Sequence, residues 1–434
     1  MSRFIISNEN AQEVVKVCKP IVARDAKVVL NLGLQDMGEN VYCGVQLSTG
    51  IEQIQYFFLS KKPEDFDGAA IKVAVNAHTF ISIVETVLAF KEDIYIEPES
   101  TMLVIGVSDK AKSSVAIEAQ TPSDIPATQP IFRMAVTGKE LAAVLTRGCS
   151  FASDEKDATH NSILQLIPSE DKIKGYSTDG NTIACCGGKV KFTKITDNTP
   201  EKAATKINAM NEELAKVAEK NGLDKEKYPL ILPKEGVLHL AGLVSGFGDV
   251  EVALQVDENH VHLKVGNTLI YTITQAAEAR VPVEYIDNMV NLPANATYGV
   301  DAAKLSDAVG FINRNNAIVG NKDISTSVTV DGEDLVVSSG ISSQFETRLH
   351  AASIDSFAEL SVDGEKFKTA VDTMNRGNLV VKVTRQDNVK FVTLLNGTPE
   401  SADTNSFIML LMVLTQKVEE SADEGEDESE SAAE

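Results

Sequence analysis

The sequence lacks the features of membrane, disulfide-rich and metal-binding proteins. It contains no tryptophan and only five cysteines in 434 residues. The cysteines are odd in number and show no zinc or redox spacing, so we interpret them as structural thiols and expect no metal site. No apolar run reaches the roughly 18 residues of a membrane-spanning helix. The first residues lack the charged head and apolar stretch of a signal peptide, and we therefore expect a cytoplasmic protein without a membrane segment.

Catalytic signatures are missing as well. The chain has no Gly-rich phosphate loop, no nucleophile motif and no cluster of metal-ligand residues. Among six scattered histidines, only His260 and His262 share a strand face, and such a pair usually marks solvated strand positions. Adjacent acids such as Asp154 and Glu155 can bind a metal, but surface acids usually just face water. The sequence predicts a protein that is not an enzyme and uses no cofactor, with a metal-dependent hydrolase as the remaining alternative.

The net charge of −23 excludes a general nucleic-acid binder with a basic surplus. Nine acidic residues lie among the seventeen residues Val418–Glu434, and no bulky apolar residue follows Val418. This composition predicts a disordered, solvated acidic tail at 418–434. Subtracting these nine charges from −23 still leaves −14 for the rest of the chain. Any contact with nucleic acid must therefore be local or weak.

A pattern of strand and helix recurs along the chain. Three segments, Phe4–Val22, Phe132–Ala152 and Tyr298–Val319, each read as an aromatic-led strand, a polar break and an amphipathic helix. A second helical pattern follows each of them, and alternating strands come next. The second pattern has the same spacing in Val75, Phe80 and Val84, in Leu232, Val237 and Ala241, and in Val362, Phe367 and Val371. The strands are Asp93–Ile96 with Met102–Val107, Val250–Val256 with His260–Ile273, and Leu379–Thr384 with Val389–Leu395.

The repeat predicts an α+β protein of three similar domains, each with two helices packed on antiparallel sheets. The expected domains are residues 1–126, 127–292 and 293–417. The second is longer because an extra helix is inserted at about 199–221, with Thr199 as its cap and Pro200 in its first turn. The alternative is three unrelated α+β domains whose patterns coincide by chance.

Motifs in the same order resemble the bacterial sliding clamps, the beta subunit of DNA polymerase III. The stretch Thr178–Ala184 is similar to a Thr-Asp-Gly-His-Arg-Leu-Ala motif of that family, with Asn181 and Thr182 in place of His and Arg. The resemblance covers nearly the whole chain and includes Phe132–Tyr176, Ile231–Lys234, Arg280–Tyr285 and Phe407–Leu414. Leu411 and Val413 replace the usual Pro and Arg, and the acidic tail extends beyond the usual end of the family. These departures suggest a divergent or virus-encoded member.

The resemblance implies a homodimer that closes into a ring around double-stranded DNA, with helices lining the hole and sheets facing outward. It also implies a clamp loader, a replicative DNA polymerase and other proteins with clamp-binding motifs as partners. Their peptides would enter an apolar pocket between the second and third domains, with ordinary core packing as the alternative for part of the matching residues. The positions that match this pocket are Thr178, Gly180, Ile183, Pro233, Leu238, Ile408, Met409, Leu410 and Met412.

The charge distribution agrees with this expectation. The six repeated helical stretches hold ten Lys or Arg and nine Asp or Glu, so nearly all the negative charge lies outside them. An ordinary helix-dipole preference also places acids first and bases later in a helix. A clamp-fold interaction scaffold that does not thread DNA is the alternative function. The bases that we expect to face DNA are Lys16, Lys19, Arg147, Arg314, Lys368 and Arg376.

Overall fold

The structure, a computed structural model, forms two compact units. The first unit is Met1–Leu292 with Asp403–Met409, and the second is Pro293–Ala402 with Leu410–Glu434. The second unit begins at the residue where the sequence predicts a third domain. The predicted boundary at 126–127, the inserted helix at 199–221, Arg376 and the acidic tail at 418–434 lie outside the described residues. The described residues are 3–23, 27–36, 40–61, 71–118, 132–154, 160–169, 171–194, 229–256, 259–266, 268–276, 279–318, 325–339, 345–356, 358–374, 377–386 and 389–412.

The six helices of the predicted repeat are all present. A polar residue at the end of the preceding strand caps most of them, because its side chain accepts a backbone N–H of the first turn. The Ser7 hydroxyl accepts the backbone N–H of Asn10, and the Thr137 hydroxyl accepts that of Glu140. Asn76, Asp301 and Asp363 act in the same way, whereas the fourth helix follows Pro233 without a side-chain cap. The helices are α1 (Asn8–Val22), α2 (Ala77–Leu88), α3 (Gly138–Gly148), α5 (Lys234–Ser245), α7 (Ala302–Ile318) and α8 (Gly364–Thr373).

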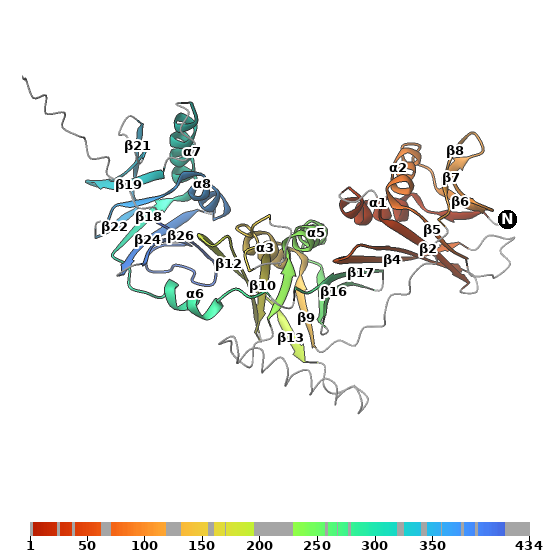
Figure 1. Ribbon diagram of the computed structural model, residues 1–434, viewed down its shortest axis with the longest axis horizontal. Coiled ribbons are helices and arrows are strands. Elements are labelled where there is room, and N and C mark those ends of the chain that lie inside the picture. Colours follow the sequence, from red (N-terminus) through yellow and green to blue (C-terminus); the bar gives the residue numbers. More distant parts are fainter. Residues whose placement is uncertain are drawn as a thin grey trace, which may run out of the picture. The chain divides into compact units, whose positions relative to one another are not determined.

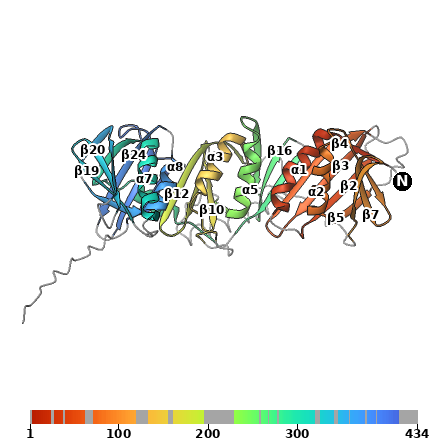
Figure 2. The ribbon, with the colours of Figure 1, turned by 90° about the horizontal axis from the view of Figure 1, so that it is seen from above.

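The helices pack in pairs, α1 with α2, α3 with α5 and α7 with α8 (Figures 1 and 2). Each buries one stripe of apolar residues against its sheets. The nine residues of the repeated spacing are all buried, three at strand ends and six on α2, α5 and α8. Fully burying one such side chain stabilises the fold by about 1.5–3 kcal/mol. The opposite face of each helix is left to solvent.

The helices of the first unit pack against antiparallel sheets. One sheet has the strand order β1-β6-β7-β8, and a second has the order β13-β9-β15-β16-β17-β4-β3-β2-β5. Leu269 of β17 pairs with Tyr56 of β4, so this sheet joins strands from the predicted first and second domains. The remaining strands follow the order β14-β10-β11-β12-β26. The strands are β1 (Phe4–Ile6), β2 (Val29–Asp36), β3 (Asn40–Ser48), β4 (Glu52–Lys61), β5 (Ile71–Asn76), β6 (Ile94–Glu99), β7 (Met102–Ser108), β8 (Ala111–Ala116), β9 (Phe132–Thr137), β10 (Ile163–Pro168), β11 (Lys172–Thr178), β12 (Thr182–Lys189), β13 (Lys191–Lys194), β14 (Leu230–Pro233), β15 (Glu251–Val256), β16 (His260–Val265), β17 (Leu269–Thr274) and β26 (Phe407–Leu411).

The second unit repeats the arrangement with the strand orders β25-β24-β18-β22 and β21-β20-β19-β23. Its helices α7 and α8 lie side by side, as in the first unit (Figure 1). The chain therefore has the mixed helix and antiparallel-sheet architecture that the repeat predicts. The strands are β18 (Ala296–Asp301), β19 (Ser325–Asp331), β20 (Asp334–Ser339), β21 (Glu346–His350), β22 (Ser353–Asp355), β23 (Leu360–Asp363), β24 (Asn378–Gln386) and β25 (Val389–Asn396).

One local prediction is wrong, and one element was missed. The stretch His260–Ile273, predicted as one strand, forms β16 and β17, because the chain turns at Gly266 with a φ of +55°. A positive φ favours glycine, which has no Cβ to clash with the backbone. The link after Arg280 contains a helix that the sequence analysis did not predict, α6 (Val283–Val290), which starts after Pro282.

The close approach of α3 and α5 predicts a sensitive position at Gly138. A Cβ at this residue would lie 2.6 Å from the backbone oxygen of Val244 and 2.9 Å from Cβ of Phe247. We expect Gly138→Ala to destabilise the protein by about 1–3 kcal/mol, because neither neighbour can move without shifting the backbone. Urea denaturation measures the change.

Gly242→Ala is the matched control. Gly242 lies on the exposed face of α5, and a Cβ there would meet no atom within 4 Å. Since alanine favours helix, this variant should be neutral or stabilised by up to about 1 kcal/mol. Equal losses in the two variants would contradict the assignment of the effect to helix packing.

Candidate functional site

The turn between β11 and β12 is built from the Thr178–Ala184 motif. The Asp179 carboxylate accepts the backbone N–H of Asn181 at 2.9 Å and that of Thr182 at 2.7 Å. The Thr178 hydroxyl accepts the N–H of Gly180 at 3.0 Å. Gly180 has a φ of +89°, a conformation that other residues rarely adopt. The motif therefore forms a closed turn whose shape is set by its own side chains.

Four of the predicted pocket residues lie in or beside one row across the sheet. Pro233 of β14 pairs with Ile163 of β10, and Thr178 of β11 pairs with Ile183 of β12. The β10–β11 register, in which Gln165 opposes Tyr176, places Ile163 opposite Thr178 when it is continued by two residues. The sheet thus brings Pro233, Thr178 and Ile183 together at the same end of their strands, and Gly180 follows in the turn.

Leu238 is the most exposed of the apolar pocket residues in the first unit. It lies on α5, one turn after Pro233, with 43% of its surface exposed. The buried stripe of α5 runs through Val237, Leu240 and Val244, so Leu238 points away from the core. Nearby, the Lys234 ammonium lies 2.6 Å from the backbone oxygen of Ala152 and 2.7 Å from the Asp154 carboxylate, and it holds the start of α5 to the segment after α3.

The predicted residues from the closing strand are mostly interior. Ile408 and Met409 of β26 are buried in the first unit, and Leu410 is buried where the chain enters the second. Met412 is half-buried, and Leu411, which was not among the predicted residues, is 43% exposed. Thr178 is also buried. The nine predicted positions thus divide into a buried group and a group with accessible surface, namely Gly180, Ile183, Pro233, Leu238 and Met412.

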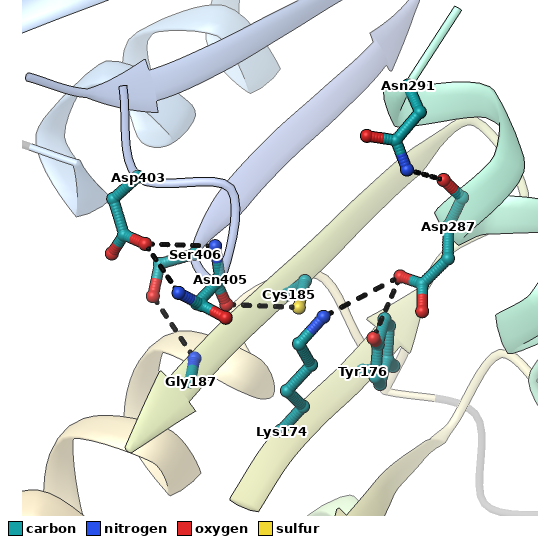
Figure 3. A network of polar contacts seen from close by, with 9 residues as sticks. All are labelled: Lys174, Tyr176, Cys185, Gly187, Asp287, Asn291, Asp403, Asn405 and Ser406. Carbon is teal, nitrogen blue, oxygen red and sulfur yellow. Dashed lines mark hydrogen bonds and ion pairs between the residues drawn. The ribbon is translucent and has the colours of Figure 1, made fainter. Parts of the chain in front are cut away.

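A polar network that the sequence analysis missed anchors this region (Figure 3). The Tyr176 hydroxyl donates to the Asp287 carboxylate of α6 at 2.9 Å, and the Lys174 ammonium lies 4.0 Å from the same oxygen. The burial of Tyr176, with Cys185 and Asp287 nearby, raises the pKa of its hydroxyl, which therefore remains a donor. This contact ties α6 to β11. The only sequence signal was the position of Tyr176 just before the Thr178 motif.

The segment before β26 is held to β12 in the same network. The Cys185 thiol donates to the backbone oxygen of Asn405 at 3.5 Å, and the N–H of Gly187 donates to the Ser406 hydroxyl at 3.1 Å. Asp403 accepts both the backbone and the side-chain N–H of Asn405. Figure 3 shows these residues converging on β12. Residues more than 200 positions apart therefore close one edge of the site.

The bases predicted to face DNA lie on helices, and most make local polar contacts. In the first unit, Lys16 pairs with Glu13 at 3.2 Å and Lys19 pairs with Glu85 at 2.5 Å. Arg147, in the last turn of α3, is half-buried.

In the second unit, Arg314 is exposed on α7 and donates to the backbone oxygen of Gly310 at 3.1 Å. Lys368 pairs with Asp372 at 2.5 Å. Lys16, Lys19 and Arg314 are exposed, whereas Arg147 and Lys368 are half-buried.

Across the described part of the chain, no group of three or more His, Cys, Asp or Glu side chains is arranged to hold a metal ion. All five cysteines are free and buried. Burial raises the pKa of the Cys18 and Cys149 thiols to about 12, which keeps them protonated. The thiols thus have the environment of structural residues rather than nucleophiles. Within the same residues, no helix has the length and apolar character required to cross a membrane.

No protein-family model and no curated protein matches the chain by sequence. Solved structures match it by fold. The Thermotoga maritima DNA polymerase III beta subunit has a TM-score of 0.74 at 8% identity, over 95% of this chain and 99% of that chain. The Bacillus subtilis DNA polymerase sliding clamp has a TM-score of 0.71 at 12% identity, over 96% of this chain and 100% of that chain. The Helicobacter pylori beta clamp, solved with a DNA ligase peptide, has a TM-score of 0.66 at 10% identity, over 95% of this chain and 99% of that chain. The chain has the fold of these proteins along their whole length.

The turn between β11 and β12 generates a stability prediction. We expect Asp179→Ala to destabilise the protein by about 1–2 kcal/mol, because it removes the acceptor of two backbone N–H groups. Urea denaturation measures the loss, and amide hydrogen exchange at Thr182 localises it. Asp171→Ala is the control: Asp171 is exposed, and its backbone oxygen, which accepts the N–H of Val190, is retained. Equal effects of the two substitutions would refute a specific role for the turn.

Proposed function

We propose that this chain, which has the fold of the bacterial DNA polymerase III beta subunit, is a DNA sliding clamp. In this role it encircles duplex DNA and keeps a replicative polymerase attached to its template, as a processivity factor rather than an enzyme. The observation that carries the proposal is the agreement of fold over 95% of this chain and 99–100% of the solved clamps.

Assembly into a ring requires surfaces that a second copy can complete. β8 lies at the edge of one sheet in the first unit, and β21 lies at the edge of one sheet in the second. Edge strands carry backbone groups that invite pairing with another chain. At the end of α7, which packs against β21, Ile318 is 81% exposed. Such edges support a homodimer whose subunits pair through edge strands.

DNA would pass along the helical side of the ring. The helices carry Lys16, Lys19 and Arg314 as exposed bases and Arg147 and Lys368 as half-buried ones, whereas the chain as a whole is strongly acidic. Contacts of such bases with phosphates do not depend on base sequence and weaken with salt, so a small number of them permits sliding. Retention then comes from the closed ring, which cannot dissociate sideways.

Partner peptides would bind at the edge of the first unit formed by the Thr178 turn and the start of α5. The accessible residues there, Gly180, Ile183, Pro233 and Leu238, combine a rigid turn with exposed apolar surface. The Helicobacter pylori beta clamp was solved with a DNA ligase peptide, which supports peptide binding by this fold. The replicative polymerase, the clamp loader and other proteins with clamp-binding motifs are the proposed partners.

Retention on DNA tests the proposed function. After loading with a cognate clamp loader, we expect the protein to remain on a circular plasmid and to leave the same plasmid rapidly once it is linearised. Gel filtration of the loaded DNA at moderate salt measures the retained fraction. Equal, salt-sensitive release from both forms would mean ordinary charge binding. Absence from both, with an active loader, would favour a scaffold that does not thread DNA.

Peptide binding provides a separate prediction for Leu238. We expect Leu238→Arg to weaken the binding of a fluorescent clamp-binding peptide by tenfold or more, because a charge replaces exposed apolar contact surface. Leu59→Arg is the matched control, since Leu59 lies on β4 and is 57% exposed. Fluorescence anisotropy gives both affinities. The pocket assignment fails if Leu238→Arg binds as tightly as the control.

A further inference from the structure

The lysines that the proposed function turns toward DNA are paired with acids on the same helical surface. The Lys19 ammonium of α1 lies 2.5 Å from the Glu85 carboxylate of α2. Lys16 of α1 lies 3.2 Å from the carboxylate of Glu13, one turn earlier. Both pairs are partly exposed, with 58% of the Lys19 side chain and 38% of the Glu85 side chain accessible. The positive charge on this surface is therefore largely neutralised before any DNA arrives.

The second unit contains a pair of the same kind. The Lys368 ammonium lies 2.5 Å from one carboxylate oxygen of Asp372, and the Ser306 hydroxyl of α7 donates to the other at 2.5 Å. Burial opposes ionisation of Asp372, but the hydrogen bonds from Lys368 and Ser306 outweigh it and lower the pKa of the carboxyl. Asp372 is thus a charged group held in place between α7 and α8.

Helix stability does not account for Glu85. It is the only Asp, Glu, Lys or Arg in α2, and it lies in the third turn, away from the helix N-terminus that acids favour. The helix is held by a buried stripe that includes Phe80, Ile81 and Val84. An exposed ion pair contributes little to stability. The remaining effect of Glu85 is that its carboxylate offsets the charge of Lys19.

We propose that Glu85, Glu13 and Asp372 restrain the contact between the ring and DNA. Each acid holds a lysine in an ion pair, so a phosphate can engage that lysine only in competition with the carboxylate. Phosphate contacts are thereby kept weak and short-lived, which favours sliding over static binding. This inference rests on the proposed function, because it requires the helical surface to face DNA, and it adds the acids to the residues that determine how the ring moves.

The test is Glu85→Gln in the full chain, with two measurements. The first is equilibrium binding to a linear duplex as a function of salt, and the second is the one-dimensional diffusion of the loaded ring on long DNA. Each lysine that gains a phosphate should steepen the slope of log affinity against log salt by about 0.9. Near 0.1 M salt this corresponds to about fivefold to tenfold tighter binding per subunit. Diffusion should slow by a similar factor.

Two variants separate this effect from a general change of charge. The double variant Lys19→Gln with Glu85→Gln should lose the added affinity, because no lysine is left to engage the phosphate. Glu97→Gln makes the same charge change away from the helices. Glu97 lies on β6, and its carboxylate is 3.0 Å from the guanidinium of Arg3. It should leave affinity, slope and diffusion unchanged. If Glu97→Gln matches Glu85→Gln, net charge explains the result and the inference is overturned.

The outcomes distinguish the inference from the proposed function. Wild-type protein that is retained on circular DNA, together with a Glu85→Gln variant of unaltered binding and diffusion, would refute the inference and leave the clamp function standing. Wild-type protein that is not retained would refute the function itself. Circular dichroism checks that each variant is folded. If Glu85→Gln fails this check, Glu13→Gln repeats the test at a pair that lies within one helix.

Discussion

The packing of amphipathic helices against antiparallel sheets is the constraint on which the structure depends. Each helix begins where a strand ends, and in five of the six repeated helices a polar side chain at that point caps the first turn. The apolar stripe that follows is buried at Phe80, Val237 and Phe367. Because one face of the helix must be buried, the opposite face must meet solvent. The side chains on that face are the ones available for function.

The electrostatics of the helices follow from this division. The chain carries a net charge of −23, but the helical stretches are close to neutral because they hold nearly equal numbers of bases and acids. Lys19 and Glu85 come from different helices, and the packing of α1 on α2 brings their charges to 2.5 Å. For the proposed ring, a nearly neutral inner surface and an acidic exterior provide weak contact with DNA and little attraction for nucleic acid elsewhere.

The candidate peptide site depends on a different constraint, the register of the sheet. Strand pairing places Pro233, Thr178 and Ile183 in one row at the same end of the sheet, although they come from three strands. Hydrogen bonds from Cys185 and Gly187 hold the segment before β26, and Tyr176 holds α6 through Asp287. The accessible residues therefore rest on a region braced by contacts that are distant in sequence. Such support favours a preformed site over one that orders on binding.

The sequence by itself determined the local elements. The period of apolar residues and the polar breaks between strand and helix located all six repeated helices to within a few residues, and they identified the α+β class, because both signals come from neighbours in the chain. It did not reveal α6 or the turn at Gly266, and it left open which pocket positions, such as Ile408 and Met409, are core residues. Only the tertiary structure decided those features, together with the carboxylate partner of Lys19, which is 66 residues away. Pairing across such distances depends on how helices and strands pack, and no local pattern of residues records it.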